Sequence, residues 1–321
     1  MNDYTFRPWQ DGDDLALLQI WHDADNTQSQ AFRSAFTVDS DSAPWSRTIV
    51  AEHQGIPVAA GTVYETSLHN RHLWSYVEVA PEHRRNGVGS ELLKQLQELA
   101  QSSPSGVSTL RTKVEKGSAG YDFATEHGLS PIQRSRMVRV HPGTVPLVPL
   151  REDEDGRPTQ EIEDIATGSV ELTRVLWDFY QKAHEWDPPA EIDLPRVNRL
   201  FLSDEAEAYG AVVLRDDVLT AKKEGKKAPI KAFAVSYRPL EADMPGFEMP
   251  EDAATEVLIG YDFEYPGARE AIMQLLSLLA HQYPVILEVD DSMEDLTVMI
   301  DHLIKSGVAE VEEETIVLAQ A

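Results

Sequence analysis

The spacing of apolar residues over the first 140 positions predicts a succession of short strands and longer helices. Alternating apolar residues predict strands at 4–8, 48–52, 57–65, 73–79, 109–114 and 134–140. Apolar residues three and four apart predict helices at 14–23, 88–101 and 118–127, the last of them ending before Gly128. Residues 24–45 are polar and irregular, with a candidate second helix at 31–36. This mixture of elements predicts an α/β fold.

The second half of the chain repeats this pattern. Residues 254–280 parallel residues 72–100, and their glycine turns are offset by 180 residues. A glycine after a helix, followed by a strand, recurs at an offset of 179 residues, in Gly128 and Gly307. We therefore expect two tandem domains, 1–142 and 161–321, joined by a linker at 143–160 that is rich in proline and charge. The alternative is a coincidence between two generic α/β patterns.

The most informative segment is the strand, turn and helix at 73–101. A basic turn containing Arg84 and Arg85 leads into a helix whose first turn contains Gly87 and Gly89. The first backbone N–H groups of a helix have no intrahelical partner, and glycines let a phosphate approach them closely. The segment therefore predicts a diphosphate site. A P-loop is disfavoured because no Lys-Ser/Thr pair follows, and a dinucleotide fold because a third glycine is missing. A purely structural glycine turn remains the alternative.

Charge and composition narrow the class of protein. The net charge of the 321-residue chain is -27, yet residues 71–140 carry +3, whereas 1–70 carry -7 and 141–321 carry -23. A site for an anionic ligand explains this basic segment, and chance clustering is the alternative. The overall acidity argues against nucleic acid or anionic membranes as partners. The sequence has no cysteine, no long apolar run and no signal-like start, so we expect a cytoplasmic protein.

The pattern Arg84-x-x-Gly87-x-Gly89 after the strand "VEVAP" resembles the acyl-CoA motif of the GNAT superfamily of N-acyltransferases. The tandem layout is similar to that of mycothiol-synthase-like proteins. The resemblance implies two domains, each with a mixed, mostly antiparallel, twisted sheet flanked by helices. It also implies that acetyl-CoA lies between the fourth and fifth strands, without any metal. The residues implied in cofactor binding are Val77, Val79, Arg84, Arg85, Asn86, Gly87, Val88, Gly89 and Ser90.

Two residues are candidates for catalysis by direct transfer to an amine. Glu78 is the carboxylate nearest the expected site and is the candidate base, although the family often has a glutamate at the position of Leu73. The family commonly uses a tyrosine as the general acid, and its position falls on Ala124 here. Tyr121, about one helical turn earlier, is the candidate substitute. The Val79 N–H is the candidate donor to the oxyanion. Each side chain has an alternative as an ordinary strand or helix residue.

The amine acceptor is not identified by the sequence. Residues 21–45 combine carboxylates with aromatic rings, which suits a cationic amine and equally suits an exposed loop. The residues concerned are Trp21, Asp23, Asp25, Phe32, Phe36, Asp39, Asp41 and Trp45.

The second copy of the motif has lost its binding chemistry. Glu264 stands in place of Arg84, Tyr265 and Pro266 replace Arg85 and Asn86, and Arg269 replaces Gly89, while Gly267 is kept. Residues 215–231 are interpreted as a solvated hairpin insertion, and 184–189, "HEWDPP", as a helix end. We expect one CoA per chain and N-acyltransferase activity in the first domain. The alternatives are a non-catalytic acyl-CoA-binding or regulatory protein, and a pure interaction module.

Overall fold

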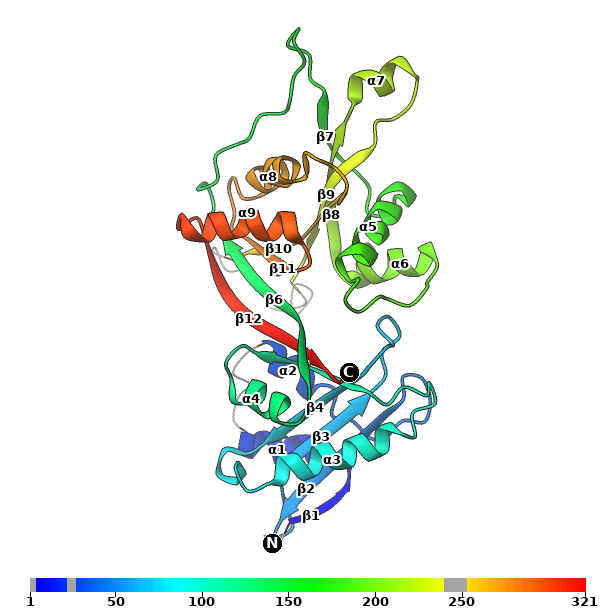
Figure 1. Cartoon of the computed structure of the whole chain (residues 1–321), viewed down its shortest axis with the longest axis vertical. Helices are drawn as coiled ribbons and strands as arrows, with labels where there is room; N and C mark the ends of the chain where they lie inside the picture. Colours follow the sequence, from blue (N-terminus) through cyan, green and yellow to red (C-terminus); the bar gives the residue numbers. More distant parts are fainter. Residues whose placement is uncertain (1–3, 22–26, 240–252) are drawn as a thin grey trace. The chain divides into compact units, whose positions relative to one another are not determined.

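The computed structural model describes residues 4–21, 27–239 and 253–321. These form two compact units, which are described separately below (Figure 1). Unit 1 contains residues 1–134, 187–190 and 315–321, and unit 2 contains residues 135–186 and 191–314.

Unit 1 has a mixed sheet in the strand order β1-β2-β3-β4-β5, followed by the C-terminal end of β12. Neighbouring strands are antiparallel except for β4 and β5, which are parallel. The elements are β1 (Tyr4–Pro8), α1 (Asp13–Trp21), α2 (Thr27–Arg33), β2 (Ser46–His53), β3 (Ile56–Tyr64), β4 (Leu73–Val79), η1 (Pro81–His83), α3 (Val88–Ala100), β5 (Leu110–Glu115), α4 (Ala119–Glu126) and β12 (Ala309–Ala319).

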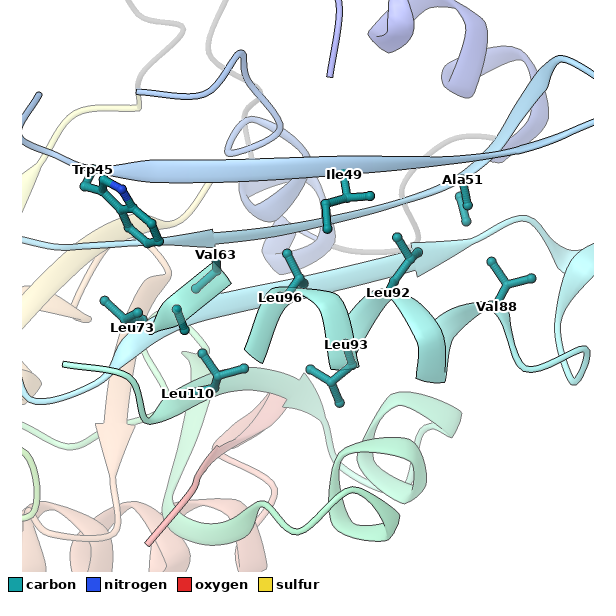
Figure 2. Packing of buried hydrophobic residues seen from close by; sticks show 12 residues of the cluster. Trp45, Ile49, Ala51, Val63, Leu73, Val88, Leu92, Leu93, Leu96 and Leu110 are labelled. Atoms are coloured by element: carbon teal, nitrogen blue, oxygen red, sulfur yellow. The ribbon is translucent and has the colours of Figure 1, made fainter. Parts of the chain in front are cut away.

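Helices cover both faces of this sheet because successive residues of β2 and β3 point to opposite sides. On one face the leucine side of α3 packs on the sheet, and Figure 2 shows Leu92 and Leu96 turned toward the strands that carry Ile49 and Val63. Close approach requires Gly61, where an added Cβ would lie 2.9 Å from a methyl carbon of Leu96. The other face forms a second core with α1 and the residues after α2.

The last strand of unit 1 is not the one that the sequence predicted. Residues 135–140 of β6 (Ser130–Val140) pair with β11 of unit 2, whereas Thr315–Ala319 of β12 pairs with β5. The expectation that 134–140 closes the first sheet was wrong. Each of the two strands follows a helix and a glycine, Gly128 or Gly307, and this local order does not say which sheet edge a strand joins. The division at 142 and 161 into separately folding domains stays a prediction.

Unit 2 has the strand order β6-β11-β10-β9-β8-β7, in which only β10 and β11 are parallel. Its elements are β7 (Gln160–Asp164), α5 (Val170–Ala183), α6 (Leu194–Phe201), η2 (Asp204–Ala206), β8 (Ala208–Asp216), α7 (Val218–Lys223), β9 (Ile230–Tyr237), β10 (Thr255–Tyr261), α8 (Ala268–Leu279), β11 (Val285–Asp290) and α9 (Glu294–Lys305). Both units thus place one helix, α3 or α8, between two parallel strands, which confirms the predicted tandem arrangement.

Two segments are more ordered than the sequence suggested. The insertion at 215–231 contains the helix α7, and its first residue, Arg215, is buried and paired with Glu163 and Glu171. Helix α5 ends at Ala183, as expected for "HEWDPP", but the Asp187 of that segment is buried in unit 1.

Candidate active site

The central feature of unit 1 is the opening between β4 and β5. The two parallel strands pair only at Leu73–Leu110 and Trp74–Arg111 and then separate. The residues beyond this point line a cavity of about 470 Å³. Because the backbone of β4 is not paired to β5 along the opening, it can hydrogen bond to a ligand there. The cavity is lined by residues of α2, β4, the turn before α3, the start of α3, β5 and α4.

The glycine turn shapes one end of this cavity. Arg85 and Gly87 both have left-handed backbone conformations, with φ of 61° and 82°, and no described side chain caps the start of α3. The N–H groups of Val88, Gly89 and Ser90 have no acceptor within the helix, by helix geometry. Gly89 keeps the space open, because an added Cβ would lie 3.4 Å from the ring of Phe123. The geometry therefore suits an anionic group.

Most of the residues predicted to bind the cofactor line this cavity. They are Val77, Val79, Arg84, Arg85, Gly87, Gly89 and Ser90. Asn86 and Val88 are not among the lining residues. The Asn86 amide donates to the carbonyls of His83 and Arg84, which holds the turn in place, and the Val88 side chain is buried in the core.

The backbone of Val79 faces the opening. The N–H groups of successive residues in a strand point to opposite edges of the strand. The N–H of Ala80, the residue after Val79, donates to the carbonyl of Val58 in β3. The N–H of Val79 therefore points away from β3, toward the separated edge. The carbonyl of Val79 accepts a hydrogen bond of 3.0 Å from Nε of Arg84, which lies at the same edge. The N–H is in position to contact a bound carbonyl oxygen.

Glu78 lines the cavity, but its carboxylate is already engaged. Arg33, from the end of α2, donates from Nη2 to Oε1 at 2.6 Å and from Nε to Oε2 at 2.9 Å. The hydroxyl of Tyr76 also donates to Oε2, at 2.9 Å. Burial is the main cause that raises the pKa of Tyr76, and the negative charge of Glu78 adds to it. The hydroxyl therefore keeps its proton and remains a donor. The sequence did not indicate Arg33, because the contact joins residues 45 positions apart.

Tyr121, the candidate acid, is not among the residues that line the cavity. Its side chain packs with Val114 against a small core of Ala124, Leu129, Ile316 and Leu318. Other residues of α4, including Phe123, line the cavity, and so does His127, which follows the helix. This packing weighs against the predicted role.

His127 is a residue of the cavity that the sequence did not indicate. Its Nδ1 lies 2.8 Å from the carbonyl of Phe123, and its Nε2 lies 2.9 Å from Oγ of Ser90. A carbonyl can only accept, so Nδ1 carries the proton of a neutral ring and Nε2 accepts from Ser90. The contact links the end of α4 to the start of α3.

Most of the groups that favoured a cationic acceptor do not line the cavity. Among those that the structure describes, Phe32 alone does, and it stacks on Tyr76 with ring centroids 4.8 Å apart. The carboxylates of Asp39 and Asp41 both pair with Arg47. The rings of Trp21, Phe36 and Trp45 are buried in the two cores. Asp23 and Asp25 lie outside the described residues.

Unit 2 has the same opening with different contents. β10 and β11 pair only at Thr255–Val285 and Glu256–Ile286 before they separate. Tyr261, the last residue of β10, is buried, and its burial raises the pKa of the hydroxyl to about 12 against the effect of backbone N–H groups at Asp295 and Leu296. The tyrosine side chain therefore reaches from the strand end to the start of α9.

The glycine turn of unit 2 is also filled. Arg269, in place of the second glycine, donates from Nε to Asp295 at 2.6 Å and so joins the starts of α8 and α9. The backbone N–H of Ala268 donates to the carbonyl of Tyr265, and the Tyr265 hydroxyl bonds to Asp216. An added Cβ at Gly267 would lie 2.8 Å from that tyrosine. These contacts occupy the place where unit 1 is open.

In the part of the chain that the structure describes, no group of three or more His, Cys, Asp or Glu side chains is placed to hold a metal ion. None of the described helices has the length and apolar character needed to cross a membrane.

Comparisons with known proteins show similarity to one family and to one fold. Residues 6–123 match the acetyltransferase (GNAT) family. A GCN5-related N-acetyltransferase from Sphaerobacter thermophilus has a similar structure, with a TM-score of 0.61 and 12% sequence identity over 99% of this chain and 95% of that one. A tandem GNAT protein from the clavulanic acid biosynthesis pathway gives a TM-score of 0.58 and 13% identity over 99% of this chain and 98% of that one. A search of curated proteins found no match.

The fold and the cavity therefore define a tandem GNAT-fold protein. Its residues 6–123 match the acetyltransferase (GNAT) family, as the glycine turn indicated.

Proposed function

We propose that unit 1 is an N-acyltransferase that moves an acyl group, most simply the acetyl group of acetyl-CoA, to an amine. The observation that carries the proposal is the opening between β4 and β5, which ends at an uncapped helix start beside Arg84 and Arg85. A thioester can lie along the β4 edge, with its diphosphate at the N–H groups of α3. The match of residues 6–123 to the GNAT family supports the same chemistry.

In this proposal the reaction is a direct transfer within a ternary complex. The amine attacks the thioester carbonyl, so that a C–N bond forms, the C–S bond breaks, and CoA leaves as a thiolate. The Val79 N–H stabilises the negative charge on the carbonyl oxygen. The amine loses a proton and the thiolate gains one. Cytoplasmic location stays a prediction.

Glu78 remains the candidate that receives the proton, directly or through a water. A carboxylate offers about four acceptor positions. Hydrogen bonds from Arg33 and Tyr76 occupy three of those on Glu78. The remaining position on Oε1 is where an amine or a water would bind. Tyr121 remains the sequence-based candidate for protonating the thiolate, although its packing places it in a core.

A second candidate function is binding of acyl-CoA without turnover. Two observations favour it: the carboxylate of Glu78 is held by an arginine, and the candidate acid is not among the residues that line the cavity. Unit 1 would then bind acyl-CoA as a regulatory ligand.

A single assay series separates these functions. Acetyl-CoA binding is measured by calorimetry, and release of free CoA thiol is measured with and without a panel of amines. Amine-dependent release supports the transferase, and binding without release supports the regulatory protein. Absence of binding contradicts both proposals and favours an interaction module.

A further inference from the structure

Glu78, which lines the cavity, forms an ion pair with Arg33 from the end of α2. We propose that Arg33 is a specificity-determining residue, which excludes dicationic and polycationic amines and favours zwitterionic amines that carry a carboxylate. This inference rests on the proposed function, since it names the acceptor class of that same site.

The negative charge of Glu78 is compensated before any acceptor binds. Both carboxylate oxygens accept from the Arg33 guanidinium, at 2.6 and 2.9 Å, in a bidentate pair. Such paired hydrogen bonds are the strong and directional kind. An ammonium group that enters a partly dry cavity needs an uncompensated counter-charge. Glu78 does not supply one while Arg33 holds it.

The pair is held in place rather than mobile at the surface. The side chains of Arg33 and Glu78 are each only 13% exposed. The Arg33 guanidinium lies over the ring of Trp21, at 5.5 Å from its centroid. On the other side, Tyr76 donates to Glu78 and is itself stacked on Phe32. Contacts on each side therefore resist the displacement of Arg33 by an incoming cation.

The lining of the cavity is mixed in charge, with the cations Arg84, Arg85 and Lys113 and the anions Glu78, Glu115 and Glu126. In the proposed function the diphosphate engages Arg84 and Arg85. Arg33, which pairs with Glu78, is then the cation beside an acceptor that binds at Glu78. A carboxylate on the acceptor compensates the ammonium and interacts favourably with the guanidinium side of the pair.

The test compares two linear probes of similar length on the CoA-loaded full chain, 1,5-diaminopentane and 6-aminohexanoate. Binding is measured by calorimetry, which does not depend on turnover. For Arg33→Gln we expect diaminopentane affinity to rise about 10-fold, equivalent to about 1.4 kcal/mol, and aminohexanoate affinity to fall. The double variant Arg33→Gln/Glu78→Gln should lose the gain, because the freed carboxylate has been removed.

The matched control is Arg47→Gln. Arg47 also pairs with carboxylates and also lies over a tryptophan, with its guanidinium 5.0 Å from the Trp45 ring. Its partners Asp39 and Asp41 do not line the cavity, whereas Glu78, the partner of Arg33, does. Replacement of Arg47 should leave the affinities of both probes unchanged. Equal diaminopentane affinity in the wild type and in a folded Arg33→Gln variant overturns the proposal, as does the same gain in Arg47→Gln.

A second variant keeps the test decisive if Arg33→Gln does not fold. Glu78→Gln leaves Arg33 without this carboxylate, so aminohexanoate should gain affinity relative to diaminopentane, and an unchanged ratio overturns the proposal. Failure of the proposed function is seen separately. If neither the probes nor other amines are acetylated but the charge preference switches as expected, the transferase proposal fails and the role of Arg33 in binding stands.

Discussion

The two units build the same opening between parallel strands and then use it differently. In unit 1 the opening leads to Gly87 and Gly89 and holds a cavity. In unit 2 it contains Tyr261, and Arg269 joins two helix starts through Asp295. The fold supplies the strand separation in both units, so the separation alone does not make a binding site. Side chains at a few positions decide whether the opening stays accessible.

The strand registers extend this comparison to the candidate base. Glu78 lies opposite Ala60 in unit 1, one residue before the end of β4. At the same place in β10, Gly260 lies opposite Phe233, and an added Cβ there would lie 2.1 Å from that ring. Phe233 packs edge-on against Phe179. In unit 2 an aromatic core thus replaces the carboxylate, which fits a scaffold rather than a second catalytic site.

A further difference between the units lies in the short segment where the two parallel strands are still paired. The residue of β5 paired with Trp74 is Arg111, whereas the corresponding residue of β11, paired with Glu256, is Ile286. Arg111 is buried and bonds to the buried Asp187. We expect Asp187→Asn to cost about 3–5 kcal/mol in the free energy of unfolding, because a buried charge is left without its partner. Chemical denaturation at pH 7 measures this, and a cost below 1 kcal/mol would contradict it.

The same variant has a defined pH dependence. Burial acts to raise the pKa of Asp187, but the hydrogen bond of His69 and the charges of Arg111, His69 and His72 outweigh it and hold the pKa below its ordinary value. A lowered folded-state pKa contributes stability above the unfolded value, and that contribution is lost as the pH falls through the folded value. The difference between wild type and variant should therefore narrow below about pH 4. A difference that stays constant to pH 2 would assign it to packing.

The glycine turn gives the next largest expected effect. Gly89→Arg copies the residue that unit 2 has at Arg269, and its side chain would compete with the ligand for the space beside Phe123. We expect acetyl-CoA affinity to fall at least about 100-fold, or about 2.7 kcal/mol. The reverse change, Arg269→Gly, should not add a site, because Tyr261 and Tyr265 remain. Wild-type affinity in a folded Gly89→Arg protein would place the diphosphate elsewhere.

Gly87 tests the backbone requirement of the same turn. Its φ of 82° is unfavourable for residues with a Cβ, so Gly87→Ala should cost about 1–2 kcal/mol in stability. The matched control is Gly168→Ala, where the φ is not in the left-handed range and an added Cβ meets nothing within 4 Å. Thermal unfolding of both variants gives the comparison. Equal melting temperatures would show that the turn relaxes without strain.

Tyr121→Phe should have the smallest effect. The ring would keep its packing against Leu129 and Ile316, and the hydroxyl is not among the groups lining the cavity. We therefore expect amine-dependent release of CoA to change less than about 2-fold, a barrier change below about 0.5 kcal/mol. A large fall in kcat with unchanged acetyl-CoA affinity would instead support the acid role indicated by the sequence.

The sequence predicted what depends on local pattern. The leucine spacing gave the helix α3, and the glycines and arginines of the turn indicated the anion site. Tyr76 and Glu78 are two residues apart on one strand, so the period of two places both side chains on the same face and makes their contact predictable. Arg33 and Asp187 were not predictable, because they meet their partners across 45 and 76 positions. The pairing of β12 with β5 was missed because β6 and β12 both follow a helix and a glycine, which does not specify a partner strand.

We expect unit 1 alone to bind acyl-CoA. The most direct measurement is a calorimetric titration of the full chain with acetyl-CoA, which counts sites whatever the acceptor is. The open turn of unit 1 and the filled turn of unit 2 predict one site per chain, abolished by Gly89→Arg and unchanged by Arg269→Gly. Two sites per chain, or one site that survives Gly89→Arg and is lost when unit 2 is altered at Tyr261, would contradict the account.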